Sequence, residues 1–241
     1  MKVYAVSDLH GMYDLYKQIK EFIQPDDIVY CLGDCGDRGP DSWATIKAVY
    51  DDPQFTYLKG NHEDMLIKAM RDNLKDEMHG FGHNLSVLSS NGGRKTFDSW
   101  REESLDDKKE WFTRLLKLPT TAEYVNTSGK KILMSHAGYN PGYEECWRDY
   151  IWDREHIYDP WDGTEDEIIL HGHTPFVYMS DAYEIEDPQA EETPGDKPIH
   201  ACWYAGHHKC CIDAGAFFTQ QTILLDLDTF EEHYFSVKEQ L

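Results

Sequence analysis

Positive charge is scarce in this sequence. Lysine and arginine together number 23, against 45 aspartates and glutamates, so the formal net charge is −22 at pH 7. The few basic residues form no stripe of the kind that binds phosphate backbones or anionic lipid surfaces. The composition therefore argues against a general nucleic-acid binder. A phosphate site in such a chain must reverse the potential locally, and bound divalent cations are the simplest means.

Long apolar runs and cysteine motifs are also missing. No stretch approaches the roughly 18 apolar residues of a membrane span, and the apolar run after Met1 is too short for a secretory signal. The six cysteines include no C-x-x-C pair and no spacing typical of a zinc knuckle or a disulfide framework. We therefore expect a cytoplasmic protein with reduced thiols and no membrane partner, while the oligomeric state is left open.

What the sequence does contain is an alternation of strand-like and helix-like segments. A length of 241 residues with 40% hydrophobic residues suits one α/β domain over 1–241. Apolar runs predict strands at residues 2–7, 27–32, 55–58, 131–135, 168–170, 209–213, 222–227 and 233–237. Helical spacing predicts helices around residues 15–23, 40–50, 65–70 and 106–118.

Two segments depart from this alternation. Residues 73–104 are polar and are expected to be irregular, and the segment near 73–118 as a whole is expected to form a helical cap over the site. Residues 182–197 are acidic and punctuated by proline. They are expected to form a solvated loop, with docking of basic peptides as a minor alternative.

The chemistry-bearing residues gather where the expected strands end. The motifs are Asp8-Leu9-His10-Gly11, Gly33-Asp34-Cys35-Gly36-Asp37-Arg38-Gly39, Gly60-Asn61-His62-Glu63, Ser135-His136-Ala137-Gly138 and His171-Gly172-His173-Thr174. Open α/β sheets build their sites at the carboxyl ends of strands. Each histidine alone would more often be a core or surface residue, but five such coincidences together indicate one site.

The candidate metal ligands carry oxygen and nitrogen donors without thiolate, which suits manganese, iron or zinc. They are Asp8, His10, Asp34, Asn61, His136 and His173. Six ligands are too many for one catalytic ion with an open position. Two divalent ions bridged by Asp34, which lies centrally in chain order, would use them all. A hydroxide held between the ions is then the expected nucleophile.

The remaining motif residues suit phosphate binding and proton transfer. Arg38 and Arg154 are candidates for gripping phosphate oxygens, because a guanidinium binds them in a bidentate fork. His62 has no evident role as a ligand and is predicted to be the general acid that protonates the leaving oxygen. Asp37 would hold the other ring nitrogen of His62 and favour the protonated ring.

With these residues, the chain resembles the calcineurin-like metallophosphoesterases, and within them the bacterial and phage branch of the phosphoprotein phosphatase family. Further segments that carry the resemblance are Asn91-Gly92-Gly93, Trp152-Asp153-Arg154-Glu155, Gly172-His173-Thr174-Pro175 and Ile212-Asp213-Ala214-Gly215-Ala216. The resemblance implies an αββα sandwich of two mixed β-sheets flanked by helices. It also implies a dinuclear centre, most often supplied with Mn²⁺, and direct attack of water on phosphorus.

The resemblance implies a serine/threonine protein phosphatase that acts on phosphorylated proteins and simple aryl phosphates. A symmetrical diadenosine tetraphosphate hydrolase is the alternative, weakly disfavoured by the shortage of basic residues. A non-catalytic metal-binding scaffold is a third reading, and it is disfavoured because no motif residue is lost. The chain departs from the family at Arg94-Lys95, at Asp213-Ala214-Gly215 and in the acidic segment, and these departures are expected to bear on specificity rather than chemistry.

Overall fold

Two five-stranded mixed sheets form the centre of the molecule. The computed structural model describes residues 1–75, 82–141, 146–186 and 197–237, and in these ranges the chain forms ten strands. The strands are β1 (Val3–Val6), β2 (Ile28–Cys31), β3 (Phe55–Tyr57), β4 (Thr121–Val125), β5 (Lys131–Ser135), β6 (Glu167–His171), β7 (Cys202–Tyr204), β8 (Lys209–Cys211), β9 (Gln221–Asp226) and β10 (Glu232–Ser236).

The first sheet has the order β10-β9-β1-β2-β3. Its three N-terminal strands run parallel, with Val3 opposite Ile28 and Val29 opposite Phe55. Strands β9 and β10 join antiparallel from the other end of the chain. Because β1, β2 and β3 are parallel, the loops after them emerge at the same edge of the sheet.

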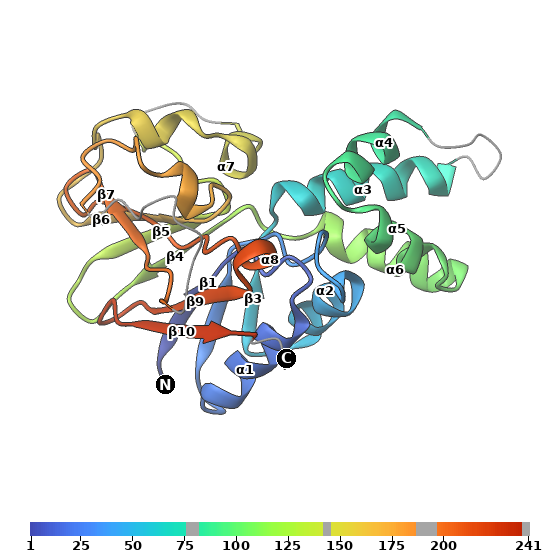
Figure 1. The fold of residues 1–241 in the computed structure, drawn as a ribbon, viewed down its shortest axis with the longest axis horizontal. Coiled ribbons are helices and arrows are strands. Elements are labelled where there is room, and N and C mark those ends of the chain that lie inside the picture. The colour runs from blue at the N-terminus through green and yellow to red at the C-terminus, as the bar shows by residue number, and fades with distance from the viewer. Residues whose placement is uncertain (76–81, 142–145, 187–196, 238–241) are drawn as a thin grey trace.

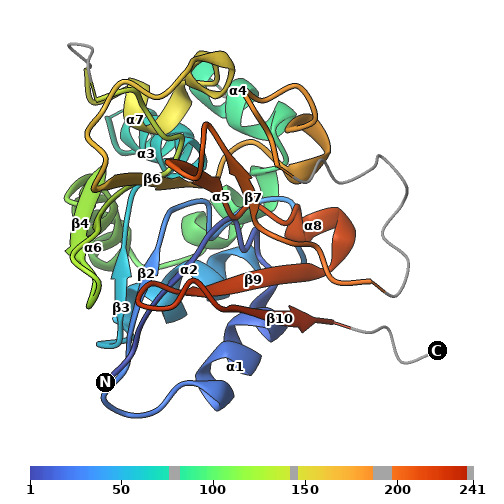
Figure 2. The ribbon, with the colours of Figure 1, turned by 90° about the vertical axis from the view of Figure 1, so that its left-hand side faces the viewer.

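The second sheet has the order β4-β5-β6-β8-β7. Strands β5, β6 and β8 are parallel, whereas β4 and β7 are antiparallel edge strands. Figure 2 shows the two sheets stacked, with α7 outside the second sheet and α1 outside the first. The predicted sandwich of two mixed sheets flanked by helices is therefore confirmed.

Alternation of side chains along β1 divides the core in two. Val3 and Ala5 point into the apolar layer between the sheets, together with Leu170 of β6 and Leu225 of β9. Tyr4 and Val6 instead join the layer between the first sheet and its helices. Successive residues of a strand face opposite sides, so a fully apolar strand such as β1 can serve both layers.

The helices complete the two outer layers. They are α1 (Tyr13–Phe22), α2 (Ser42–Asp51), α3 (Asn61–Lys75), α4 (His83–Ser90), α5 (Arg94–Arg101), α6 (Leu105–Leu116), α7 (Asp149–Trp152) and α8 (Ala216–Thr219), with short 3-10 helices at Glu155–Tyr158 and Phe176–Tyr178. Helices α3 to α6 form a group beside the sheets (Figure 1). Their buried side chains, including Trp100 and Leu115, belong to the core on the helix side of the first sheet.

Several local predictions were wrong. Much of the segment 73–104 is helical rather than irregular, because α4 and α5 bury Leu88, Phe97 and Trp100 at irregular spacing within polar sequence. Strands β4 and β7 were not expected. β4 alternates half-buried and exposed side chains at a sheet edge, so it has no apolar run to mark it.

The remaining expectations concern the acidic segment and the membrane. Most of the predicted loop at 182–197 lies outside the described residues. Among the described residues, no helix is both long enough and apolar enough to cross a membrane. That the chain forms one domain, with a helical cap over the site, stays a prediction.

Adjacent leucines on α6 test whether the helical group shares one cooperative core with the sheets. Leu115 is fully buried, whereas Leu116 is 45% exposed. Leu115→Ala should lower the free energy of unfolding in urea by about 2–5 kcal/mol through the cavity it leaves. Leu116→Ala should change it by less than about 0.5 kcal/mol. A separate early transition in Leu115→Ala would mean that the helices unfold independently of the sheets.

Candidate active site

The predicted motif residues meet where the strand ends of the two sheets face each other. Asp34 follows β2 in the first sheet, and His136 follows β5 in the second. The His136 Nε2 atom lies 3.3 Å from Asp34 Oδ2, and both side chains are buried. The His136 Nδ1 atom also lies 2.9 Å from the Leu32 carbonyl oxygen, which ties the two strand ends together.

Two trios of side chains have the geometry to hold a metal ion. One consists of Asp8, Asp34 and His136, and the other of His10, Asp34 and His62. In each trio the potential ligand atoms lie within 4.8 Å of one another, and all five residues are buried. Asp34 belongs to both trios, which is the position that the sequence predicted for a bridging carboxylate.

The other two predicted ligands lie beside the first trio. The Asn61 Oδ1 atom is 2.9 Å from His136 Nε2 and 3.0 Å from His173 Nδ1. The His173 backbone N–H donates to Asp8 Oδ2 at 3.0 Å. All six predicted ligands therefore converge, although His62, which was assigned a different role, shares the second trio.

The buried carboxylates of this cluster favour positively charged groups beside them. Burial would raise the pKa of the Asp34 carboxyl, but His136, His62 and His10 hold it well below its usual range. Burial disfavours charge on His136, yet the carboxylates of Asp34 and Asp8 raise its pKa to about 10. A protonated His136 thus offsets only part of the negative charge of the two carboxylates, and burial raises the pKa of Asp8.

Two other ligand candidates are neutral. Burial lowers the pKa of His10 and of His173 well below the usual value for histidine. Neutral imidazole is the form that binds metal ions. Because the donors are carboxylate, imidazole and amide groups around a cluster that draws positive charge, the residues fit divalent metal ions.

The two predicted phosphate-binding arginines lie over this cluster and are exposed. Arg38 places one guanidinium nitrogen 2.8 Å from His10 Nε2 and the other 2.9 Å from His62 Nε2. The Nε atom of Arg154 donates to His173 Nε2 at 3.1 Å. Buried acids and imidazoles therefore form the floor of the site, and guanidinium groups form part of its rim.

His62 is fixed by a chain of hydrogen bonds. Its Nδ1 lies 2.7 Å from Asp37 Oδ2, and the Thr96 hydroxyl donates to Asp37 Oδ1 at 2.5 Å. Burial lowers the pKa of His62, but Asp34 and Asp37 outweigh this effect and raise it. Asp37 therefore orients the ring and favours its protonated form, which can donate from Nε2 once Arg38 no longer donates to that nitrogen.

The backbone of the motifs is strained. Six predicted site residues adopt positive φ angles of 42° to 67°, namely Asp8, His10, Asp34, Asp37, Arg38 and His173. Non-glycine residues rarely adopt this left-handed conformation, and each instance costs of order 1–3 kcal/mol. Such strain clusters at functional sites, because the surrounding structure must hold side chains in positions that a relaxed strand end would not give them.

Glu63 holds the loop of Asp34 from behind. Its Oε2 accepts from the backbone N–H groups of Asp34 and Gly60, each at 2.8 Å, and its Oε1 accepts from Cys35 N–H at 3.1 Å and Tyr57 Oη–H at 2.7 Å. The side chain is 1% exposed. Glu63 therefore fixes the two loops that supply Asp34 and Asn61.

Sequence reasoning assigned no role to three residues that the structure places at the site. They are Glu63, Thr96 and Phe217. Glu63 belongs to a recognised motif, so its position next to two ligands was a usable signal. Thr96 comes from a helix that was not expected, and Phe217 comes from a turn far along the chain, so neither had a signal in the local sequence.

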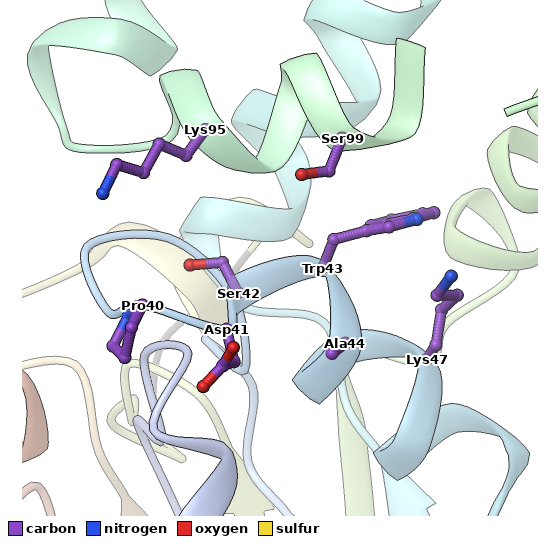
Figure 3. Close-up of a pocket in the computed structure, with 8 residues that line it drawn as sticks. All are labelled: Pro40, Asp41, Ser42, Trp43, Ala44, Lys47, Lys95 and Ser99. Atoms are coloured by element: carbon purple, nitrogen blue, oxygen red, sulfur yellow. The ribbon is translucent and has the colours of Figure 1, made fainter. Parts of the chain in front are cut away.

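A pocket of about 250 Å³ lies between α2 and α5 (Figure 3), and Pro40 and Asp41, which precede α2, also line it. Ser42, Trp43 and Lys47 line it from α2, and Lys95 and Ser99 face them from α5. The Lys47 ammonium is 3.0 Å from Glu103 Oε1, so its charge is already paired.

Replacing Glu63 by glutamine tests its role as the support of the Asp34 loop. Whichever oxygen becomes the amide nitrogen, at least one buried backbone N–H then faces a donor, so stability should fall by about 1–3 kcal/mol. Urea unfolding measures this loss. Glu103→Gln is the matched control, since this half-buried carboxylate pairs at the surface and should lose less than about 1 kcal/mol. Equal losses in the two variants would contradict the role of Glu63.

Curated relatives of this chain carry two kinds of name. A symmetrical bis(5′-nucleosyl)-tetraphosphatase of Buchnera aphidicola is 26% identical over 60% of this chain and 47% of its own length. Serine/threonine-protein phosphatase 2 of Escherichia coli is 30% identical over 59% of this chain and 60% of its own length. The chain thus spans about half the length of the first of these relatives and somewhat more of the second.

A solved structure described as a candidate diadenosine tetraphosphatase superposes with a TM-score of 0.60. It is 15% identical in sequence, over 99% of this chain and 94% of that one, and therefore shows the shared fold alone. The family described as calcineurin-like phosphoesterase matches residues 1–210, which include every predicted ligand. The chain belongs to the calcineurin-like phosphoesterase family.

Proposed function

We propose that the protein is a metal-dependent phosphomonoesterase that hydrolyses phosphoserine, phosphothreonine and simple aryl phosphates. The observation that carries this proposal is the pair of buried trios that share Asp34, with Arg38 and Arg154 exposed above them. Such a site combines cation-binding groups with guanidinium groups that match phosphoryl oxygens.

In this proposal two divalent ions, most often Mn²⁺ but also Fe or Zn, are held by the six converging residues. These are Asp8, His10, Asp34, Asn61, His136 and His173. When bound, the ions would supply Lewis-acid stabilisation of the phosphoryl group and lower the pKa of a coordinated water. Asp34 is the one residue common to both candidate groups and so would contact both ions.

The arginines bind and orient the substrate. Arg38 and Arg154 direct guanidinium nitrogens at ring nitrogens of the floor, at 2.8 to 3.1 Å, and both are exposed to an incoming ligand. Phosphoryl oxygens are acceptors that a guanidinium binds more strongly than the neutral rings of His10 and His173, and binding to phosphate would also take Arg38 away from the Nε2 atom of His62. The two side chains would therefore turn to the phosphate and fix it over the floor.

His62 transfers the proton. Its Nδ1 is held by Asp37, so Nε2 is the nitrogen that faces Arg38 and the floor. As the ester bond breaks, the leaving oxygen gains negative charge and takes the proton from Nε2. Asp37 stabilises the imidazolium before the transfer, and Thr96 holds Asp37 in place.

A symmetrical dinucleoside tetraphosphatase is the second candidate. The Buchnera aphidicola relative carries that name at an identity close to that of the phosphatase-named relatives. The pocket between α2 and α5 offers the ammonium group of Lys95 for further phosphates, while Lys47 is paired with Glu103. A non-catalytic scaffold is disfavoured, because the proposed acid His62 lies in the floor and both proposed phosphate-binding arginines contact floor residues.

His62→Asn separates the general acid from the ligands. Turnover should fall by roughly 10²–10⁴-fold, the usual worth of general acid catalysis. Metal content, measured by elemental analysis after dialysis, should stay close to that of the wild type. Asp34→Asn is the contrasting variant and should lose bound metal. Loss of one ion in His62→Asn would instead make His62 a ligand, as its place in the second trio allows.

Metal removal and substrate choice are tested together. Protein stripped by a chelator should release no phosphate, and Mn²⁺ should restore activity. A phosphothreonine peptide and diadenosine tetraphosphate are then compared by kcat/KM. A higher value for the peptide is expected. A higher value for the dinucleotide would replace the proposed function by the second candidate, and inactivity on both would favour the scaffold.

A further inference from the structure

An exposed aromatic turn lies at the site and has no part in the chemistry described so far. Helix α8 is a single turn between β8 of the second sheet and β9 of the first. Left-handed residues stand at both of its ends, Gly215 with φ 65° and Gln220 with φ 57°. The turn presents Phe217 and Phe218, each 43% exposed.

Only one of the two phenylalanines reaches the site residues in the contacts described. The guanidinium carbon of Arg38 lies 4.9 Å from the centre of the Phe217 ring, a cation–π distance. The ring also stands edge-to-face with His10, with 6.0 Å between ring centres. Phe218 instead stacks on Phe176, at 6.3 Å, and packs against Phe217.

The contact with Arg38 fixes where a substrate would meet Phe217. If Arg38 binds the phosphoryl group, the Phe217 ring packs against the same guanidinium group that holds the phosphate. The group esterified to that phosphate is attached directly to it. Because the floor is buried, this group would extend from the phosphate toward the exposed rim, where Phe217 lies. Large exposed apolar surface beside a polar site is typical of a wall that contacts the apolar part of a ligand.

We propose that the Phe217 ring is the wall against which the leaving group lies, and that it favours aryl over alkyl phosphate esters. This inference rests on the proposed phosphomonoesterase function. Aromatic rings gain from edge-to-face or offset packing beyond the area they bury. A phenyl group on the ester oxygen can make such a contact, whereas the chain of a phosphoserine offers one methylene group.

The reaction itself is the same for both esters. Water forms a bond to phosphorus, the phosphorus–oxygen ester bond breaks, and the leaving oxygen departs as a phenol or an alcohol with the proton of His62. One proton of the water stays on the phosphate, and the other is released to solvent, from which His62 regains its proton. Phenols are more acidic, with a pKa of about 10, and leave more easily. The test must therefore use the change in the aryl-to-alkyl ratio on mutation, not the rates of the two substrates.

The experiment compares Phe217→Ala with Phe218→Ala, a matched control in the same turn with the same exposure. The substrates are a phosphotyrosine and a phosphoserine peptide of identical flanking sequence, with Mn²⁺ present. Phe217→Ala should lower the ratio of their kcat/KM values by about 3- to 10-fold, the worth of one aromatic contact. Phe218→Ala should leave the ratio within about twofold of the wild-type value. Phe217→Tyr keeps an aromatic ring and should retain the wild-type ratio.

A binding measurement gives the same comparison without turnover. Titration calorimetry with phenylphosphonate and propylphosphonate should show Phe217→Ala weakening the phenyl compound more, by a similar factor. If Phe217→Ala weakened binding of both phosphonates, or lowered kcat/KM for both peptides, by the same factor, Phe217 would only position Arg38. If neither binding nor kcat/KM changed, the ring would lie outside the substrate path. Either result overturns the inference. A wild type inactive on both peptides would instead contradict the proposed function.

Discussion

The buried charge of Asp34 is the constraint on which the rest of the site depends. Its carboxylate is nearly inaccessible to water, and histidines from both sheets compensate it. Glu63 fixes its backbone. Gly60 leaves it room, because a Cβ there would collide with the Asp34 side chain. A buried charge persists only where its partners are held in place, so much of the local structure serves this one group.

The double-sheet architecture explains how those partners arrive. Each sheet delivers loops at the carboxyl ends of parallel strands, and stacking brings Asp34 of one sheet against His136 of the other. Close approach at the meeting point again requires glycine, since a Cβ on Gly172 would collide with Ser7 and Asp8. The left-handed backbone of six site residues is strained, and this strain accompanies the convergence of their side chains on one centre. Burial of apolar side chains on both faces of the first sheet supplies stabilising free energy that offsets the strain.

The ligand candidates could be predicted from the sequence because each follows an apolar strand within a short motif, and strand ends are where such folds place their sites. The supports could not be predicted in the same way. Thr96 reaches Asp37 across 59 positions of sequence from a helix whose pattern is polar. Phe217 meets Arg38 only because a turn between the sheets folds over the first strand ends. Edge strand β4 was not predicted from the sequence, because its alternate side chains are exposed and it contains no apolar run.

Substrate choice must lie outside the buried floor. Relatives of about 26% to 30% identity carry the names of protein phosphatases and of dinucleoside tetraphosphatases. The proposed binding of two cations and a phosphoryl group by the floor would serve either reaction equally, because both break a bond from phosphorus to oxygen. What differs is the group beyond that oxygen, and in this chain that group would meet Arg38, Phe217 and the pocket beside α5. The exposed rim is therefore where the proposed activities diverge, and the exposed Phe217 ring is a feature that would distinguish an aromatic group from an aliphatic one.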